Sequence, residues 1–173
     1  FGIIKERKNP PDRRVVFSPN KLKELKNRFP EAKIKVENSD VRIFPDTAYD
    51  NVGVDVMNDV SDCDVLIGVK EVPLEALIPN KKYFFFSHTI KKAAYNRKLL
   101  QAVLKKNIEL YDHETITKEN GARLIGFGRY AGIVGAYNGF RAFGLKNETF
   151  SLPKAENLAN QQALINKLNE INL

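Results

Sequence analysis

Two side chains that can move protons follow two apolar runs of the chain. Lys70 comes directly after Val65–Val69, and His88 follows Tyr83–Phe86 with one serine between. Apolar runs of this length predict buried strands of a parallel sheet. Because ligands bind at the carboxyl ends of such strands, both side chains are expected at one edge, facing one ligand. An amine and an imidazole placed there would form an acid/base pair.

Each of these residues also fits a structural role when it is considered alone. Lysine is almost always solvated where a strand reaches the surface. A single histidine after an aromatic run commonly completes a core. The equivalent positions of Lys70 and His88 favour chemistry, but their spacing alone leaves both interpretations open.

Predicted strands and helices alternate along the chain. Strands are expected at 2–4, 32–37, 52–56, 65–69, 83–86 and 108–111, and helices at 19–29, 96–106, 131–143 and 155–172. The alternation predicts an α/β fold with a mostly parallel, twisted sheet flanked by helices, of the Rossmann-like or flavodoxin-like kind. Asn120-Gly121 predicts a hairpin turn between 115–117 and 123–125. A length of 173 residues predicts a single domain, 1–173.

The composition narrows the class of partner. The net charge is +7, but basic residues are scattered among acidic ones, as on solvated helix faces, which favours a small anionic substrate over nucleic acid. No apolar run approaches the roughly 18 residues needed to span a bilayer. The single cysteine, Cys63, excludes an internal disulfide and fits a reducing cytoplasm. With one cysteine, and with His88 and His113 too far apart in sequence, no zinc site is expected.

Residues 126–131 formally match the dinucleotide-binding fingerprint GxGxxA, with Glu148 about 20 residues on. Three features argue against a nucleotide site here. First, the apolar run before the fingerprint is only two residues long, Leu124-Ile125. Second, the side chains of Arg129 and Tyr130 add bulk where the backbone must approach a phosphate. Third, Glu148 follows no convincing second strand. The sequence therefore predicts no cofactor site in this segment.

Packing explains the glycines of the same segment better. Each glycine in a helix costs about 1 kcal/mol relative to alanine. Glycines three or four residues apart share one helix face, so close contact with another backbone is the expected compensation. The glycines concerned are Gly128, Gly132, Gly135 and Gly139.

Several motifs, in order, resemble a known family. They are KERKNPPDRRVVFSP near the start, then GVKEVP, FFFSHTIKK, ELYDHE and FGRYAGIVGAYNG. Together they resemble the N-terminal substrate domain of the saccharopine dehydrogenases and lysine–2-oxoglutarate reductases. That group is related to the alanine dehydrogenases and the nicotinamide nucleotide transhydrogenases. The resemblance covers nearly the whole chain, and it rests on the combination, since no single motif is specific.

The resemblance implies roles for six residues. Lys70 and His88 would be the acid/base catalysts, and Arg14 would bind a substrate carboxylate. Lys8 would support binding electrostatically. Glu71 and Glu114 would meet the substrate's ammonium group and influence proton transfer.

The resemblance also implies an oxidoreductase acting on CH–NH bonds with NAD or NADP. The cofactor would be bound mainly by a C-terminal domain absent from this chain, towards which the helix 155–172 leads, so the chain alone is expected to lack catalysis. The implied substrates are saccharopine, or lysine and 2-oxoglutarate. Alanine dehydrogenase and a non-catalytic amino-acid-binding module remain alternatives, and a homo-oligomer is left open.

Overall fold

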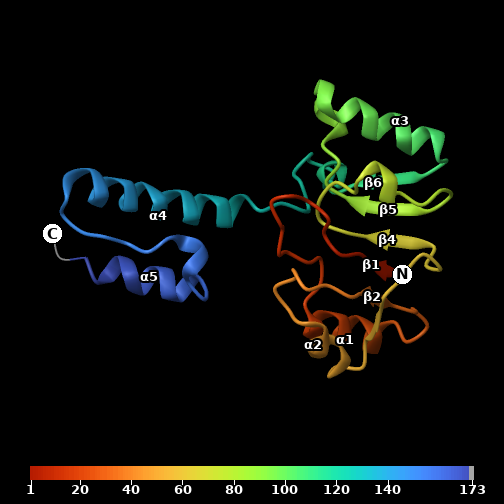
Figure 1. The fold of residues 1–173 in the computed structure, drawn as a ribbon, viewed down its shortest axis with the longest axis horizontal. Helices are drawn as coiled ribbons and strands as arrows, with labels where there is room; N and C mark the ends of the chain where they lie inside the picture. Colours follow the sequence, from red (N-terminus) through yellow and green to blue (C-terminus); the bar gives the residue numbers. More distant parts are fainter. Residues whose placement is uncertain (172–173) are drawn as a thin grey trace. The chain divides into compact units, whose positions relative to one another are not determined.

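The computed structural model describes residues 1–171, and its centre is one six-stranded parallel sheet. The strands lie in the order β3-β2-β1-β4-β5-β6, and every pair of neighbours is parallel (Figure 1). This confirms the predicted α/β fold. The strands are β1 (Gly2–Ile3), β2 (Lys35–Glu37), β3 (Asp55–Met57), β4 (Val65–Ile67), β5 (Lys82–Phe85) and β6 (Glu109–Asp112).

The helices and short 3₁₀ turns connect these strands. The α-helices are α1 (Pro19–Arg28), α2 (Asp46–Asp50), α3 (Arg97–Lys105), α4 (Gly128–Asn147) and α5 (Gln161–Asn169). The 3₁₀ turns are Leu74–Ala76, Thr89–Lys91, Ala94–Asn96, His113–Thr115 and Ala155–Asn157. Helix α1 begins as its sequence predicts: Ser18 Oγ accepts the Lys21 amide at 3.4 Å, and Pro19 occupies the first turn.

Both faces of the sheet are covered, because successive strand residues point to opposite sides. Leu66 joins a core with Tyr83, Phe85 and two α3 residues, Leu99 and Val103. Its neighbour Ile67 packs on the other side, in a core with Ile3, Leu22 of α1 and Tyr49 of α2. Helices α1 and α2 therefore cover one face and α3 the other.

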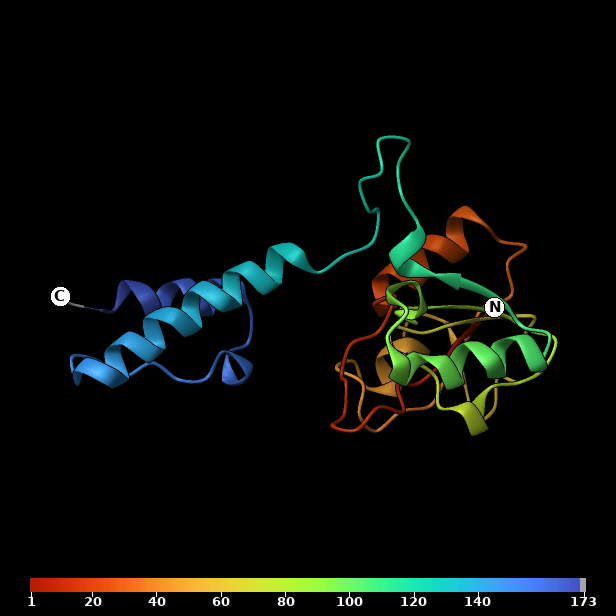
Figure 2. The same ribbon diagram turned by 90° about the horizontal axis from the view of Figure 1, so that it is seen from above.

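The chain gathers into two compact units, Phe1–Ile125 and Gly126–Leu173. The first holds the whole sheet. In the second, α4 and α5 lie side by side (Figure 2). They enclose a small core of Tyr137, Leu152 and Leu164, and the Tyr137 hydroxyl donates to Pro153 O at 2.9 Å. The helix expected at 155–172 is instead a 3₁₀ turn followed by α5, and its last residue, Asn172, lies outside the described residues. Within residues 1–171, no helix combines the length and apolar character needed to cross a membrane.

The expected close contact of the α4 glycines is not found among residues 1–171. A Cβ atom added at Gly128, Gly132, Gly135 or Gly139 would meet nothing within 4 Å among the described residues. Gly144 is the α4 glycine in close contact, since a Cβ there would lie 2.5 Å from Phe150. Glycine spacing defines a helix face, but it does not supply the segment that would pack there.

The hairpin after β6 forms as predicted. Thr117 and Arg123 pair as an antiparallel bridge, and the Lys118 amide donates to Ala122 O at 2.8 Å. Gly121 has a φ of +78°, which glycine adopts without strain. The turn carries Arg123 back towards the carboxyl edge of the sheet, beside the residues that follow β6.

Candidate active site

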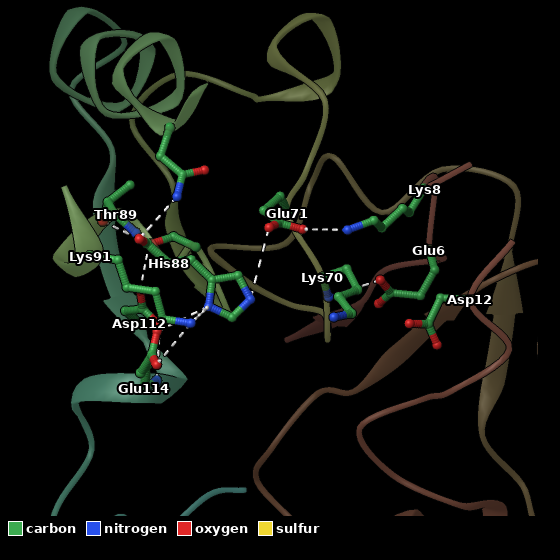
Figure 3. A network of polar contacts seen from close by, with 12 residues as sticks. Glu6, Lys8, Asp12, Lys70, Glu71, His88, Thr89, Lys91, Asp112 and Glu114 are labelled. Atoms are coloured by element: carbon green, nitrogen blue, oxygen red, sulfur yellow. Dashed lines mark hydrogen bonds and ion pairs between the residues drawn. The ribbon is translucent and has the colours of Figure 1, made fainter. Parts of the chain in front are cut away.

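The carboxyl ends of β1, β4, β5 and β6 meet at one edge and bring together charged side chains from distant parts of the sequence (Figure 3). His88 follows β5 with φ 56°, in the left-handed region that L-residues seldom enter. The buried Asn96 holds this conformation, since its Nδ2 donates to His88 O at 3.0 Å. The imidazole is stacked near Phe86, with 6.1 Å between ring centroids.

Two carboxylates flank the His88 ring. Nδ1 lies 3.0 Å from Glu114 Oε2, and Nε2 lies 3.9 Å from Glu71 Oε1. The shorter contact assigns the Nδ1 proton to the Glu114 hydrogen bond, which leaves the Nε2 lone pair to accept a proton. Glu71 would stabilise the imidazolium once that proton arrives. The arrangement suits reversible proton transfer at Nε2.

Glu114 is buried yet surrounded by cations. Arg123 NH2 lies 2.8 Å and Lys91 Nζ 3.5 Å from Glu114 Oε1. The hydrogen bond from His88 lowers the pKa of Glu114, and the charges of Arg123 and Lys91 lower it further, against the effect of burial. Glu114 therefore stays ionised and keeps the His88 ring oriented.

Glu71 continues the line of charges in the opposite direction. Its Oε2 lies 3.5 Å from Lys8 Nζ, which comes from the segment after β1. Lys8, Glu71, His88 and Glu114 thus lie in a line across the edge of the sheet, with a carboxylate on each side of the His88 ring, as Figure 3 shows. A ligand that carries both carboxylate and ammonium groups finds complementary partners here.

Lys70 lies beside this line, between Glu71 and the carboxylates of Glu6 and Asp12 (Figure 3). The hydrogen bond from Arg14 is the main cause that lowers the pKa of Asp12, and the charge of Lys70 contributes. Lys70 is partly buried, and it leaves β4 at the edge where His88 leaves β5.

Arg14 has a different immediate partner from the one expected. Its Nε lies 2.9 Å from Asp12 Oδ1, and its NH2 bonds Asp12 Oδ2, so the two side chains form a bidentate pair. Arg14 is thus linked to the neighbourhood of Lys70 through Asp12. A substrate carboxylate would share or replace Asp12 on this guanidinium.

Several residues of this edge were missed by the sequence analysis, among them Glu6, Asp12, Lys91 and Arg123. Glu6 and Asp12 both belong to the motif KERKNPPDRRVVFSP, so that motif could have revealed them. Lys91 lies three residues after His88, within hydrogen-bonding distance of its ring. Arg123 is 9 positions from Glu114 and reaches it only through the hairpin, for which the Asn120-Gly121 turn was the available signal.

Buried polar residues beneath the site fix its framework. Ser87 Oγ donates to Asp112 Oδ2, and Asp112 Oδ1 accepts the Glu114 amide at 2.8 Å. His113 Nε2 lies 3.0 Å from Gly68 O, which ties the end of β6 to the end of β4. His113 Nδ1 is buried without a hydrogen-bond partner among the described atoms. His113 acts in the framework, and it is His88 that faces the charged line.

The dinucleotide fingerprint at 126–131 has no structural support. It follows the hairpin, not a strand of the parallel sheet, and Gly126 and Phe127 precede α4 as irregular chain. The strand–turn–helix unit that would cradle a pyrophosphate is thus missing at this place, and these residues do not fit a nicotinamide dinucleotide. Within residues 1–171, no three His, Cys, Asp or Glu side chains gather as metal ligands.

Two solved structures share this fold. The structure matches an L-alanine dehydrogenase with a TM-score of 0.62 and 18% identity, over 85% of this chain and 41% of that chain. It matches a transhydrogenase from Sinorhizobium meliloti with the same TM-score and identity, over 82% of this chain and 42% of that chain.

Curated relatives are closer in sequence. The alpha-aminoadipic semialdehyde synthase of Arabidopsis thaliana is 38% identical over 78% of this chain, which is 13% of the synthase. The mitochondrial synthase of Bos taurus is 35% identical over 84% of this chain, 16% of that protein. The saccharopine dehydrogenase [NAD(+), L-lysine-forming] of Candida glabrata is 30% identical over 90% of this chain, 44% of that enzyme. The chain spans less than half the length of each of these relatives.

The family model described as "Alanine dehydrogenase/PNT, N-terminal domain" matches residues 2–134. This range includes the whole sheet and every charged side chain described above at its carboxyl edge. The chain therefore belongs to the family of the alanine dehydrogenase/PNT N-terminal domain.

Proposed function

We propose that this chain is the substrate-binding and proton-transferring part of an NAD(P)-dependent dehydrogenase that interconverts saccharopine with lysine and 2-oxoglutarate. One observation carries the proposal: Lys70 and His88 leave neighbouring parallel strands at one edge, among basic and acidic side chains that suit a zwitterionic substrate. The relatives named as saccharopine dehydrogenases and alpha-aminoadipic semialdehyde synthases support it.

The edge offers partners of both signs for saccharopine, which carries carboxylates, a primary ammonium group and a secondary amine. Arg14 would bind a substrate carboxylate through its planar fork. Lys8 would add positive charge beside it. Glu71 and Glu114 would meet the ammonium group and attract it to the acidic side of the site.

Lys70 and His88 would divide the proton transfers. The Lys70 amine takes the proton from the substrate's secondary amine as the carbon–nitrogen bond is oxidised to an imine. His88 Nε2 then removes a proton from the water that attacks the imine carbon, while Glu114 holds the Nδ1 proton in place. Breakdown of the resulting carbinolamine releases lysine and 2-oxoglutarate. In the opposite direction the same two groups assist condensation.

The nicotinamide cofactor accepts or supplies the hydride, and a separate domain would hold it. The fingerprint at 126–131 lacks its strand, so the described residues provide no dinucleotide site at that place. Whether the partner domain takes NAD or NADP is decided by residues outside this chain.

The test is an absorbance assay on the natural polypeptide that carries this chain together with its nucleotide-binding domain. NADH and NADPH are each tested with lysine plus 2-oxoglutarate, and separately with pyruvate plus ammonia. We expect oxidation of the cofactor only with the first pair. Oxidation only with the second pair would assign the protein to alanine dehydrogenase, and no turnover with either would overturn both enzymatic functions.

A further inference from the structure

A carboxylate from the segment that follows β1 holds the backbone of Lys70. Glu6 lies in the segment after β1, 64 residues before Lys70. Its Oε1 accepts the Val69 amide at 2.7 Å, and its Oε2 accepts the Lys70 amide at 2.9 Å. One side chain therefore bonds two consecutive amides, the second of which belongs to the proposed base.

These two amides follow the last regular bonds of β4. The Ile4 amide donates to Ile67 O at 3.0 Å, and the Gly68 amide donates to Phe84 O at 2.8 Å. Beyond Gly68 the Val69 carbonyl still accepts the Phe86 amide at 3.0 Å. The amides of Val69 and Lys70, however, have the carboxylate of Glu6 as their acceptor in place of a neighbouring strand. Charge-assisted hydrogen bonds of this kind are shorter and stronger than neutral ones.

The surroundings of Glu6 are built to receive it. A Cβ atom at residue 68 would lie 2.9 Å from Ile4 Cγ1, so the close approach of Ile4 favours glycine there. The same Cβ atom would lie 3.4 Å from Glu6 Oε1, so Glu6 passes directly beside Gly68. Burial raises the pKa of Glu6, and the Val69 and Lys70 amides oppose that effect. The carboxylate is thus withdrawn from water and directed at the backbone of the site.

We propose that Glu6 is the positioning residue of Lys70. Its two hydrogen bonds fix the backbone from which the Lys70 amine extends and thereby set where that amine meets the substrate. The proposal rests on the proposed function for its effect on rate, whereas the effect on the backbone stands on the structure alone. Glu6 acts through Lys70 and takes no proton from the substrate.

The kinetic test uses the natural polypeptide with Glu6→Gln, Glu6→Asp and, as a matched control, Asp59→Asn. A glutamine keeps the length of Glu6 but offers one acceptor oxygen, and its amide group opposes the second backbone N–H. Misplacement by about 1 Å can cost a hundredfold in rate. We expect kcat of Glu6→Gln to fall by up to about a hundredfold with KM within about twofold. Aspartate retains the charge but reaches only one amide, so the kcat of Glu6→Asp should lie between those of the parent and Glu6→Gln.

The control changes the same kind of contact elsewhere. Asp59 Oδ1 accepts the Ser61 amide at 2.8 Å, before β4 and outside the charged edge. Asp59→Asn should leave kcat and KM unchanged. If Glu6→Gln keeps the parent kcat in an active enzyme, or if it changes KM alone, the proposal is overturned.

A second measurement on the full 173-residue chain is independent of catalysis. In ¹⁵N NMR relaxation, the order parameters of the Val69 and Lys70 amides should fall in Glu6→Gln, from about 0.85 for rigid backbone towards about 0.6. Asp59→Asn should leave them unchanged. Unaltered order parameters in Glu6→Gln would overturn the proposal even in an active enzyme. An inactive parent would refute the proposed function and leave the NMR result to decide whether Glu6 holds Lys70.

Discussion

At the scale of single residues, the imidazole of His88 is oriented from both sides. Glu114 holds Nδ1 at 3.0 Å, and Glu71 lies 3.9 Å from Nε2. The left-handed backbone at His88 costs roughly 1–3 kcal/mol, and such strain persists where the surrounding structure fixes it. Asn96 does so by donating to His88 O. His88 thus combines a strained backbone, an imidazole ring held in one orientation and two neighbouring carboxylates, and its side chain can exchange protons.

Glu114 should make the stability of the chain depend on pH in acid. Because its pKa is lowered in the folded state, its stabilisation is fully present above its ordinary value of 4.5 and is lost as the pH falls through the lowered folded value. We expect Glu114→Gln to flatten this loss. Urea unfolding followed by circular dichroism, from about pH 6 to about pH 3, measures it.

Glu24→Gln is the matched control for that experiment. The pKa of Glu24 is also lowered, by the hydrogen bond from Lys21, but both side chains are exposed and solvent screens them. Its pH profile should follow that of the parent. A Glu114→Gln profile as steep as the parent's would show that the Glu114 contacts do not stabilise the fold.

At the scale of elements, the sequence predicts those strands and helix ends that are determined by a local pattern of residues. Apolar runs identify β4 and β5 within about two residues, and Ser18-Pro19 identifies the start of α1. The boundaries of α4 and α5 differ from the prediction. The spacing of apolar residues shows where a helix lies, but small or polar residues at its ends do not alter that spacing, so it does not show where the helix begins or ends. The glycine face of α4 was predicted to pack closely, and no residue within 1–171 packs there. Periodicity identifies such a face but cannot reveal its partner.

The two kinds of glycine should respond in opposite ways to alanine. At Gly68 the added methyl group collides with Ile4, so Gly68→Ala should destabilise the sheet unit by about 1–3 kcal/mol. At Gly132 the methyl group meets open space in a helix, so Gly132→Ala should stabilise α4 by up to about 1 kcal/mol. Denaturant unfolding measured by circular dichroism gives both changes. Destabilisation at Gly132 would mean that the glycine face is covered in the chain in solution.

At the scale of the whole molecule, the sheet and the candidate site belong to one compact unit. All six strands lie within Phe1–Ile125, as do Lys8, Arg14, Lys70, Glu71, His88 and Glu114. Lys70 and His88 were predictable as a pair, because parallel strands present their carboxyl ends at one edge. The other four residues were expected only because the motifs resemble those of a known family. Arg123 was not, because its place depends on how a hairpin folds back.

A chain ending after Ile125 should therefore fold without the rest. We expect its amide NMR signals for β1 to β6 to coincide with those of the full chain. A chain ending after Asn107 is the matched control, since it loses β6 and the Asp112 contacts beneath the site, and it should not fold. A disordered spectrum for 1–125 would show that the sheet unit depends on the second unit.

The most direct test of the account is the rate of saccharopine oxidation by Lys70→Met in the natural polypeptide. Loss of a general acid/base group typically costs about 10²- to 10⁴-fold, and we predict a fall of that size in kcat. Lys98→Met, which removes an exposed lysine on α3, should match the parent. A Lys70→Met enzyme within a few-fold of the parent would contradict the account, because the amine at the end of β4 would then move no proton in the reaction.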